Sequence, residues 1–183
     1  AYLSLGSSPV VLALVAWALV LNVGYSGVAG TWKYVPLLSA LDLGQLFVLG
    51  TLFVWVREQS RAKGLLFAVL GGLTFVWISA GAARTVHHWL GVPFVWDRLV
   101  DSVALQASWS ILWTLLALGL MIHATRRGLR TLWFAGFGLL GVVGLKLMLV
   151  DTAHVNTLGR TVSLLGVALL VIAASYFAPT PPK

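Results

Sequence analysis

Six apolar runs, each close to the length of a membrane-spanning helix, dominate this sequence. A helix needs about 20 mostly apolar residues to cross the hydrocarbon core of a bilayer. The runs cover residues 9–27, 37–56, 64–83, 102–123, 131–150 and 161–177. Within a bilayer a helix satisfies its own backbone hydrogen bonds, whereas an open strand does not. The sequence therefore predicts an all-α, polytopic bundle of about six spans that form a single transmembrane domain.

The composition excludes a soluble domain and several kinds of site. Hydrophobic residues make up 60% of the 183 and charged residues only 9%, whereas soluble domains carry roughly 25% charged residues. The net charge of +7 falls in short loops, where it meets lipid head groups rather than nucleic acid. Cysteine is absent, so disulfides and thiolate metal sites are excluded. We expect the lipid bilayer, and no nucleic acid, as partner.

The distribution of Lys and Arg predicts the orientation. The side that holds both termini carries seven of them: Arg57, Arg61, Lys63, Arg126, Arg127, Arg130 and Lys183. The opposite side carries four: Lys33, Arg84, Arg98 and Arg160. Because cytoplasmic loops are enriched in Lys and Arg, we expect both termini in the cytoplasm. The longest connection, residues 84–101, would then lie on the opposite face, with residues 86–96 in the membrane interface.

Most titratable residues gather on that opposite side. Asp42 opens the second span, Arg84 closes the third, and Arg160 opens the sixth, while Lys146 and Asp151 flank the end of the fifth. Charges near hydrocarbon are costly unless they are paired or hydrated. Two interpretations remain open: a structural ion-pair network in which Lys146 pairs with Asp42 or Asp151, and a catalytic or transport site. Lys146 could also extend to the head groups from its position near a helix end.

The second interpretation assigns roles to particular residues. As an enzyme, the protein would use Asp42 or His87 as base on a lipid-linked or periplasmic anionic substrate. Candidates for substrate binding are Arg84, Gln106, Lys146, Asp151 and Arg160. As a transporter subunit, it would use Asp42 and Lys146 as a proton or ion relay.

Polar residues within the spans have a simpler explanation. Asp42 and Gln45 share one face of the second span, and Gln106, Ser110 and Trp113 share one face of the fourth. Hydrogen bonds between helices account for such stripes. His87 and His88 point about 100° apart on a helix and ligate one ion poorly, although His154 could complete a metal or haem site. We expect no metal and no cofactor.

Three stretches together resemble a known family. Residues 34–43 read YVPLLSALDL, similar to a PLLNPLDL-type entry into a helix, with Ser39-Ala40 in place of Asn-Pro. Residues 106–113 read QASWSILW, and the last part contains KLMLVD at 146–151 and LGRTVSLLGV at 158–167. From about Tyr34 onward the chain resembles the C-terminal part of the bacterial membrane proteins catalogued as domain of unknown function 2339. The resemblance implies the last six spans of a longer protein, as does the start at Ala1, and implies no activity.

The function expected from the sequence is therefore structural. We predict a scaffolding module in a bacterial inner membrane, surrounded by other transmembrane helices of the same longer protein or of a membrane complex. The membrane enzyme and the transporter subunit are the two alternatives. A water-filled cavity reaching Asp42 and Lys146 would favour either alternative, whereas a scaffold needs none.

Overall fold

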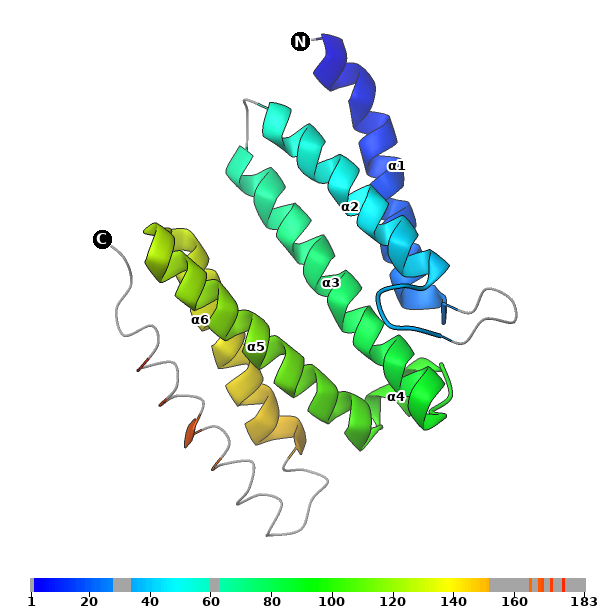
Figure 1. Cartoon of the computed structure of the whole chain (residues 1–183), viewed down its shortest axis with the longest axis vertical. Coiled ribbons are helices and arrows are strands. Elements are labelled where there is room, and N and C mark those ends of the chain that lie inside the picture. Colours follow the sequence, from blue (N-terminus) through cyan, green and yellow to red (C-terminus); the bar gives the residue numbers. More distant parts are fainter. Residues whose placement is uncertain are drawn as a thin grey trace. The chain divides into compact units, whose positions relative to one another are not determined.

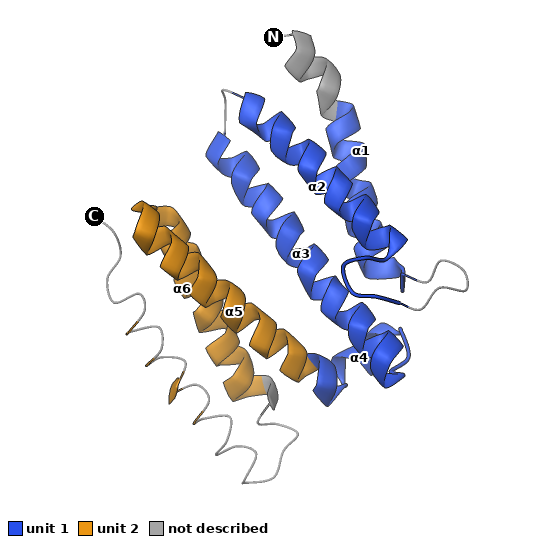
Figure 2. Ribbon diagram, viewed as in Figure 1, with its two compact units in different colours: residues 1–105 blue, residues 106–183 orange. Residues whose placement is uncertain are grey.

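The computed structural model of the chain is helical, and Figure 1 shows its elements in chain order. It describes residues 2–27, 34–59 and 63–151, together with Leu165, Ala168, Leu169, Ile172 and Tyr176. These described residues contain six α-helices and one short π-helical segment, and no strand. The predicted all-α class is thus confirmed. The chain divides into two compact units, Ala1–Leu105 and Gln106–Lys183 (Figure 2).

The first unit is built on three long helices and one short helix. These are α1 (Tyr2–Gly24), α2 (Ala40–Glu58), α3 (Lys63–Leu90) and α4 (Trp96–Val100). The helices α1, α2 and α3 all contact one another. A small apolar core lies between them, formed by Ala18, Val48, Leu49, Leu52 and Leu73. Trp77 packs against this core from α3.

The second unit contains a helical hairpin. It is formed by α5 (Val103–Arg127), whose first three residues belong to the first unit, and by α6 (Arg130–Lys146), which continues into the π-helical segment Leu147–Asp151. Gly128, at φ +66°, ends α5 in the left-handed conformation that glycine adopts without strain. The two helices approach closely at Gly136, where an added Cβ would lie 2.9 Å from the carbonyl oxygen of Ala117.

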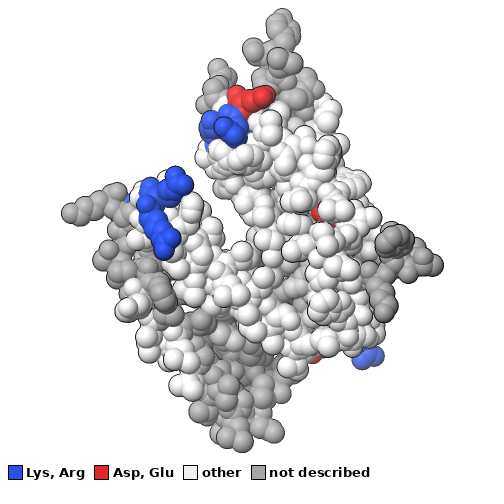
Figure 3. Space-filling model, in the orientation of Figure 1, with Lys and Arg blue, Asp and Glu red and all other residues white. Residues whose placement is uncertain are grey.

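Four helical stretches have the length and composition to cross a membrane: Ala40–Glu58, Lys63–Leu90, Val103–Arg127 and Arg130–Leu149. Pro9–Gly24 of α1 is a shorter apolar helix. Uncharged residues, drawn white, cover most of the described surface in Figure 3, as a lipid-facing surface requires. The number of spans and the cytoplasmic location of the termini stay predictions. The expected sixth span, 161–177, lies outside the described residues apart from five helical positions.

Several helix boundaries differ from those expected from hydropathy: α1 covers Tyr2–Gly24 rather than 9–27, α5 ends at Arg127 rather than at 123, and two further differences lie near Asp42 and Arg84. The helix α2 begins at Ala40 rather than near Leu37, because Leu37 has a φ of 66° and Ser39 caps the helix. The helix α3 continues seven residues beyond Ala83 and ends at Leu90, before Gly91 at φ +70°. The expected interfacial segment 86–96 therefore includes the last turn of α3. Arg84 is an interior residue of that helix and not its end.

Candidate functional site

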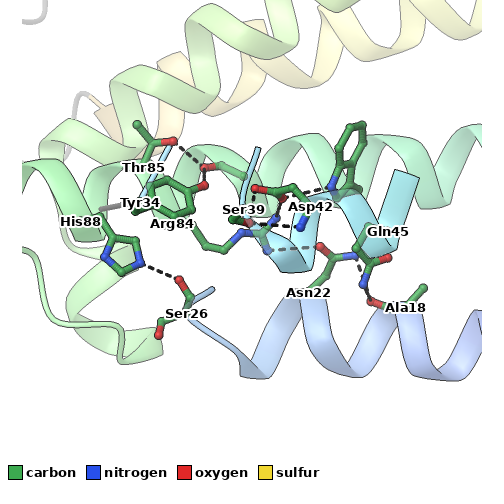
Figure 4. Close-up of polar contacts among 12 residues, drawn as sticks. Ala18, Asn22, Ser26, Tyr34, Ser39, Asp42, Gln45, Arg84, Thr85 and His88 are labelled. Atoms are coloured by element: carbon green, nitrogen blue, oxygen red, sulfur yellow. Dashed lines mark hydrogen bonds and ion pairs between the residues drawn. The ribbon is translucent and has the colours of Figure 1, made fainter. Parts of the chain in front are cut away.

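A buried ion pair joins α2 and α3 in the first unit. The Nη2 of Arg84, on α3, lies 2.6 Å from the Oδ1 of Asp42, on α2. The two side chains are 0% and 1% exposed, so neither reaches solvent. Figure 4 shows the contacts that surround the pair. Further hydrogen bonds to both partners offset part of the cost of removing an ion pair from water.

Asp42 is positioned by the start of its own helix. Ser39 is the N-cap of α2: its Oγ accepts a hydrogen bond from the backbone N–H of Asp42 at 3.1 Å and donates one to Asp42 Oδ2 at 2.7 Å. The indole Nε1 of Trp77 donates to Oδ1 at 3.2 Å. A carboxylate in the first turn is also favoured by the helix dipole. Both carboxylate oxygens of Asp42 are therefore occupied by protein donors.

Arg84 connects the carboxylate to the end of α1. Its Nη1 donates to Asn22 Oδ1 at 3.3 Å, so the guanidinium joins residues from α1, α2 and α3. Gly27, at φ +82°, passes close to it: an added Cβ there would lie 3.0 Å from Arg84 Cδ. The Nε of Arg84 is buried and has no acceptor among the described residues. The backbone after α1 and the arginine side chain therefore fit closely together.

A second polar contact lies one turn earlier on α1. The carbonyl oxygen of Ala18 accepts from Asn22 Nδ2 at 2.9 Å and from Gln45 Nε2 at 3.2 Å. Gln45 is 0% exposed, and its Oε1 has no donor within the described part of the chain. Gln45 thus bonds to α1 and Asp42 to α3, so both residues of the expected shared face make hydrogen bonds between helices.

Tyr34 and two histidines form a layer beside the ion pair. Tyr34 stacks on His88 with ring centroids 4.4 Å apart, and the Nε2 of His88 lies 2.7 Å from the carbonyl oxygen of Ser26. Burial, as the main cause, raises the pKa of the Tyr34 hydroxyl above its usual 10.0. The hydrogen bond between its hydroxyl and the carbonyl oxygen of Gly81 is long, at 3.5 Å. This layer connects the segments around α1 and α2 to the end of α3.

His87 points into a different environment from Asp42. Its Nδ1 lies 2.6 Å from the carbonyl oxygen of Val92, and its ring packs against Phe94 and His88. No hydrogen bond within the described residues joins it to Asp42, so the two candidate bases are not brought into one hydrogen-bonded group. The described residues also contain no cluster of three or more His, Asp or Glu side chains that could hold a metal ion.

The second unit contains a smaller polar group around Lys146. Its Nζ donates to the backbone oxygen of Gln106 at 3.1 Å and to Ser110 Oγ at 2.8 Å. Ser110 Oγ in turn donates to the same backbone oxygen at 2.9 Å. Gln106 and Ser110 thus share one face of α5, as expected, and Trp113 stacks on Trp109 with centroids 5.7 Å apart.

Other expected partners of Lys146 remain untested. The side chain of Asp151 and all of Arg160 and His154 lie outside the described residues. The pairing of Lys146 with Asp151 or with Asp42 stays a prediction, as do the roles of these residues in binding a substrate.

Two residues of the ion-pair site were missed by sequence reasoning. Ser39 stands three residues before Asp42, the spacing of a helix-capping serine and the acidic residue that it contacts. Trp77 precedes Arg84 by seven residues, which places both on the same face of a helix. Both signals were therefore present in the sequence. These two spacings become informative only when it is known that α2 begins at Ala40 and that α3 continues past Ala83.

Comparisons with known proteins give one match. A family model described as "Predicted membrane protein (DUF2339)" matches residues 1–181. No curated protein and no solved structure matches significantly.

Proposed function

Because this chain belongs to the DUF2339 family of predicted membrane proteins, we propose that it is a structural module of a larger envelope protein or assembly in a bacterial inner membrane. In this proposal the buried network around Asp42 and Arg84 fixes the packing of three helices. It takes no part in binding or transforming a substrate.

The main support for this proposal is that the ion pair is hidden from solvent and that protein donors occupy both carboxylate oxygens of Asp42. Asp42 accepts hydrogen bonds from Ser39, Trp77 and Arg84, and both charged side chains are at most 1% exposed. A general base must reach the proton that it abstracts, directly or through one water. A carboxylate whose oxygens are occupied by protein donors, away from solvent, is suited to holding helices together.

The energetics of a membrane favour such a polar connection. Between lipid-exposed helices there is little hydrophobic driving force, and close packing and hydrogen bonds between helices contribute to association. The pair and its neighbours join α1 through Asn22, α2 through Asp42 and α3 through Arg84. Removing one partner of a buried ion pair leaves an uncompensated charge and costs about 3–5 kcal/mol. We infer that these contacts set the relative rotation of the three helices.

The experiment compares broken and replaced ion pairs. Asp42→Asn and Arg84→Gln, made singly in the intact gene, are compared with the double variant Asp42→Leu/Arg84→Met. Asp101→Asn, which alters an exposed carboxylate of the same unit, is the control. The measurements are abundance in the membrane, thermal stability in detergent, and the growth or envelope phenotype that the intact gene supports.

A structural network predicts a specific pattern among these variants. Each single variant loses function only in proportion to its lost abundance or melting temperature, and the control behaves as wild type. The double variant recovers much of the lost abundance and melting temperature, because well-packed apolar residues often replace a buried ion pair at little cost. A stable, abundant variant of Asp42 or Arg84 that fails to support the phenotype would contradict the proposal. That result would favour the enzyme or transporter alternative.

A further inference from the structure

The turn between α5 and α6 carries the most concentrated positive charge of the described structure. Arg126 and Arg127 end α5, Arg130 begins α6, and only Gly128 and Leu129 lie between them. All three arginines are exposed. We call these five residues, 126–130, the arginine turn. Since both helices qualify as membrane spans, the arginine turn lies at a membrane surface.

No carboxylate of the second unit compensates this charge nearby. Residues 106–150 contain no Asp or Glu, and the first acidic residue, Asp151, lies at the opposite end of the α6 hairpin arm. The turn between α2 and α3 is different, because Glu58 accompanies Arg57, Arg61 and Lys63 there. In Figure 3, one group of charged side chains contains both blue (Lys or Arg) and red (Asp or Glu) residues, whereas another contains only blue ones. Within the described residues, no carboxylate forms an ion pair with the arginine turn, so an external anion can bind there.

Helix stability does not explain all three arginines. Arg126 and Arg127 lie in the last turn of α5, where the helix dipole favours a cation. Arg130 is the first residue of α6, where the dipole disfavours one. The preceding Leu129 offers no side-chain hydrogen bond to offset this. A positive charge at that position makes sense if an anion is held between the arginines.

The surroundings of the arginines are those of a head-group boundary. The guanidinium of Arg130 lies over the ring of Phe134, with its carbon 5.8 Å from the ring centroid. Leu129 and Phe134 are 46% and 48% exposed, so apolar side chains face outward beside the charges. Guanidinium groups bind phosphate oxygens through paired N–H donors. Apolar side chains next to them fit the upper part of the acyl chains.

We propose that the arginine turn is a binding surface for the head groups of anionic phospholipids in the leaflet that it faces. The proposal is independent of the structural role of the Asp42–Arg84 pair, because it uses neither of these residues. The geometry favours lipid phosphate over an acidic protein segment because apolar residues flank the arginines at the level where two spans leave the membrane.

The test measures lipid preference directly. The full chain is reconstituted in bilayers of phosphatidylcholine that contain a trace of spin-labelled phosphatidylglycerol or phosphatidylcholine. Electron paramagnetic resonance then gives the motionally restricted fraction of each label. At low salt we expect the wild type to associate with phosphatidylglycerol about fivefold more strongly than with phosphatidylcholine. The preference should fall toward unity at about 0.5 M salt, because exposed charges are screened.

Two double variants with the same change in net charge distinguish lipid binding at the arginine turn from a general effect of the protein's net charge. Arg126→Gln/Arg127→Gln should lower the preference to less than about twofold. Arg57→Gln/Lys63→Gln, in the turn that also contains Glu58, should leave most of it. An unchanged preference in the first variant would overturn the proposal. An equal loss in both variants would overturn it as well, since the preference would then follow net charge and not the arginine turn.

Arg130→Gln keeps the proposal testable if a double variant folds poorly. Removing a cation from the start of α6 should leave the melting temperature unchanged or raise it, while the preference for phosphatidylglycerol falls. A residue with a merely structural role would lower the melting temperature when replaced. Retention of the full lipid preference by a folded Arg130→Gln variant would count against the proposal.

Discussion

The two units hold their buried polar groups in different ways. In the first unit, Arg84 and Asp42 neutralise each other with almost no exposure. In the second unit, Lys146 is partly exposed and donates to two neutral oxygens, the backbone oxygen of Gln106 and the hydroxyl of Ser110. A guanidinium in the interior of a helix pair requires a countercharge. An ammonium group on a flexible chain near a helix end can reach polar surroundings by extending along the helix.

The same contrast appears in how the helices pack. The helices of the first unit are joined by side-chain hydrogen bonds that cross from α1 and α2 to α3. In the second unit, α5 and α6 approach at Gly136, which lies against Ala117, Leu120 and Met121. Small residues allow such close backbone approach in membrane helices. Polar connection and close packing are thus alternative means of association within one chain.

The largest expected effect comes from removing Arg84, the cation of the buried ion pair, and a smaller one comes from removing Lys146. Arg84→Met leaves the carboxylate of Asp42 buried and unpaired, and we expect a loss of about 3–5 kcal/mol. Lys146→Met removes the hydrogen bonds to Gln106 and Ser110 from a side chain that is partly exposed, and we expect a smaller loss of about 1–2 kcal/mol. Thermal unfolding in detergent, followed by circular dichroism, measures both.

Equal losses in the two variants would break the comparison. A loss for Lys146→Met as large as that for Arg84→Met would mean that Lys146 also neutralises a carboxylate, as expected from the sequence for Asp42 or Asp151. Adding Asp151→Asn to Lys146→Met would then recover stability if Asp151 is the partner, because the unpaired charge would be gone.

The second prediction concerns close packing in the hairpin of α5 and α6. Gly136→Ala places a Cβ 2.8 Å from Met121 Cγ and 2.9 Å from the carbonyl oxygen of Ala117. The methionine side chain can move, but the backbone oxygen cannot, and overpacking of this kind costs about 1–3 kcal/mol. Gly138→Ala meets nothing within 4 Å and should stabilise the helix by roughly 0.5–1 kcal/mol.

Melting temperatures that move in opposite directions for these two substitutions would support the close approach of α5 and α6. If Gly136→Ala were as stable as Gly138→Ala, close packing at Gly136 would not hold the hairpin together. The polar contacts of Lys146 would then be the main link between its two helices.

The helical membrane fold was predictable because it depends on the length of the apolar runs, a property of local sequence. The end of α3 was not, because hydropathy falls at Arg84 although the helix continues to Leu90. The arginine can be buried within the helix because its charge is neutralised by Asp42, forty-two residues earlier in the chain. A contact between residues so far apart in the chain cannot be predicted from local sequence.

The membership of the candidate site was only partly predictable for a related reason. Sequence position placed Asp42, Arg84 and His87 near one end of their helices, and this is enough to suggest a cluster. Which of them bond depends on the rotation of each helix about its axis, which packing sets. The structure pairs Asp42 with Arg84 and directs His87 toward the carbonyl oxygen of Val92. The roles of these residues in any reaction stay predictions.

The smallest expected effect concerns Tyr34, at the edge of the paired network and before the start of α2. Burial raises the pKa of its hydroxyl above 10.0, with the nearby carboxylate of Asp42 adding to the rise and the side chains of Thr85 and Arg84 opposing it. Below pH 10 the hydroxyl is neutral in the folded and unfolded states alike. Tyr34→Phe therefore loses only a long hydrogen bond to Gly81, worth a few tenths of a kcal/mol.

Above pH 10 the two proteins should diverge. The unfolded tyrosine ionises first, so the wild type loses stability as the pH rises through the higher pKa of the folded state, and Tyr34→Phe does not share this loss. Absorbance at 295 nm should show that the variant lacks the ionisation with a midpoint above 10. If the missing ionisation instead has an ordinary midpoint, Tyr34 is solvated, and the polar network of the first unit is open to water at this edge. The contrast with the partly exposed Lys146 of the second unit would then no longer be one of exclusion from solvent.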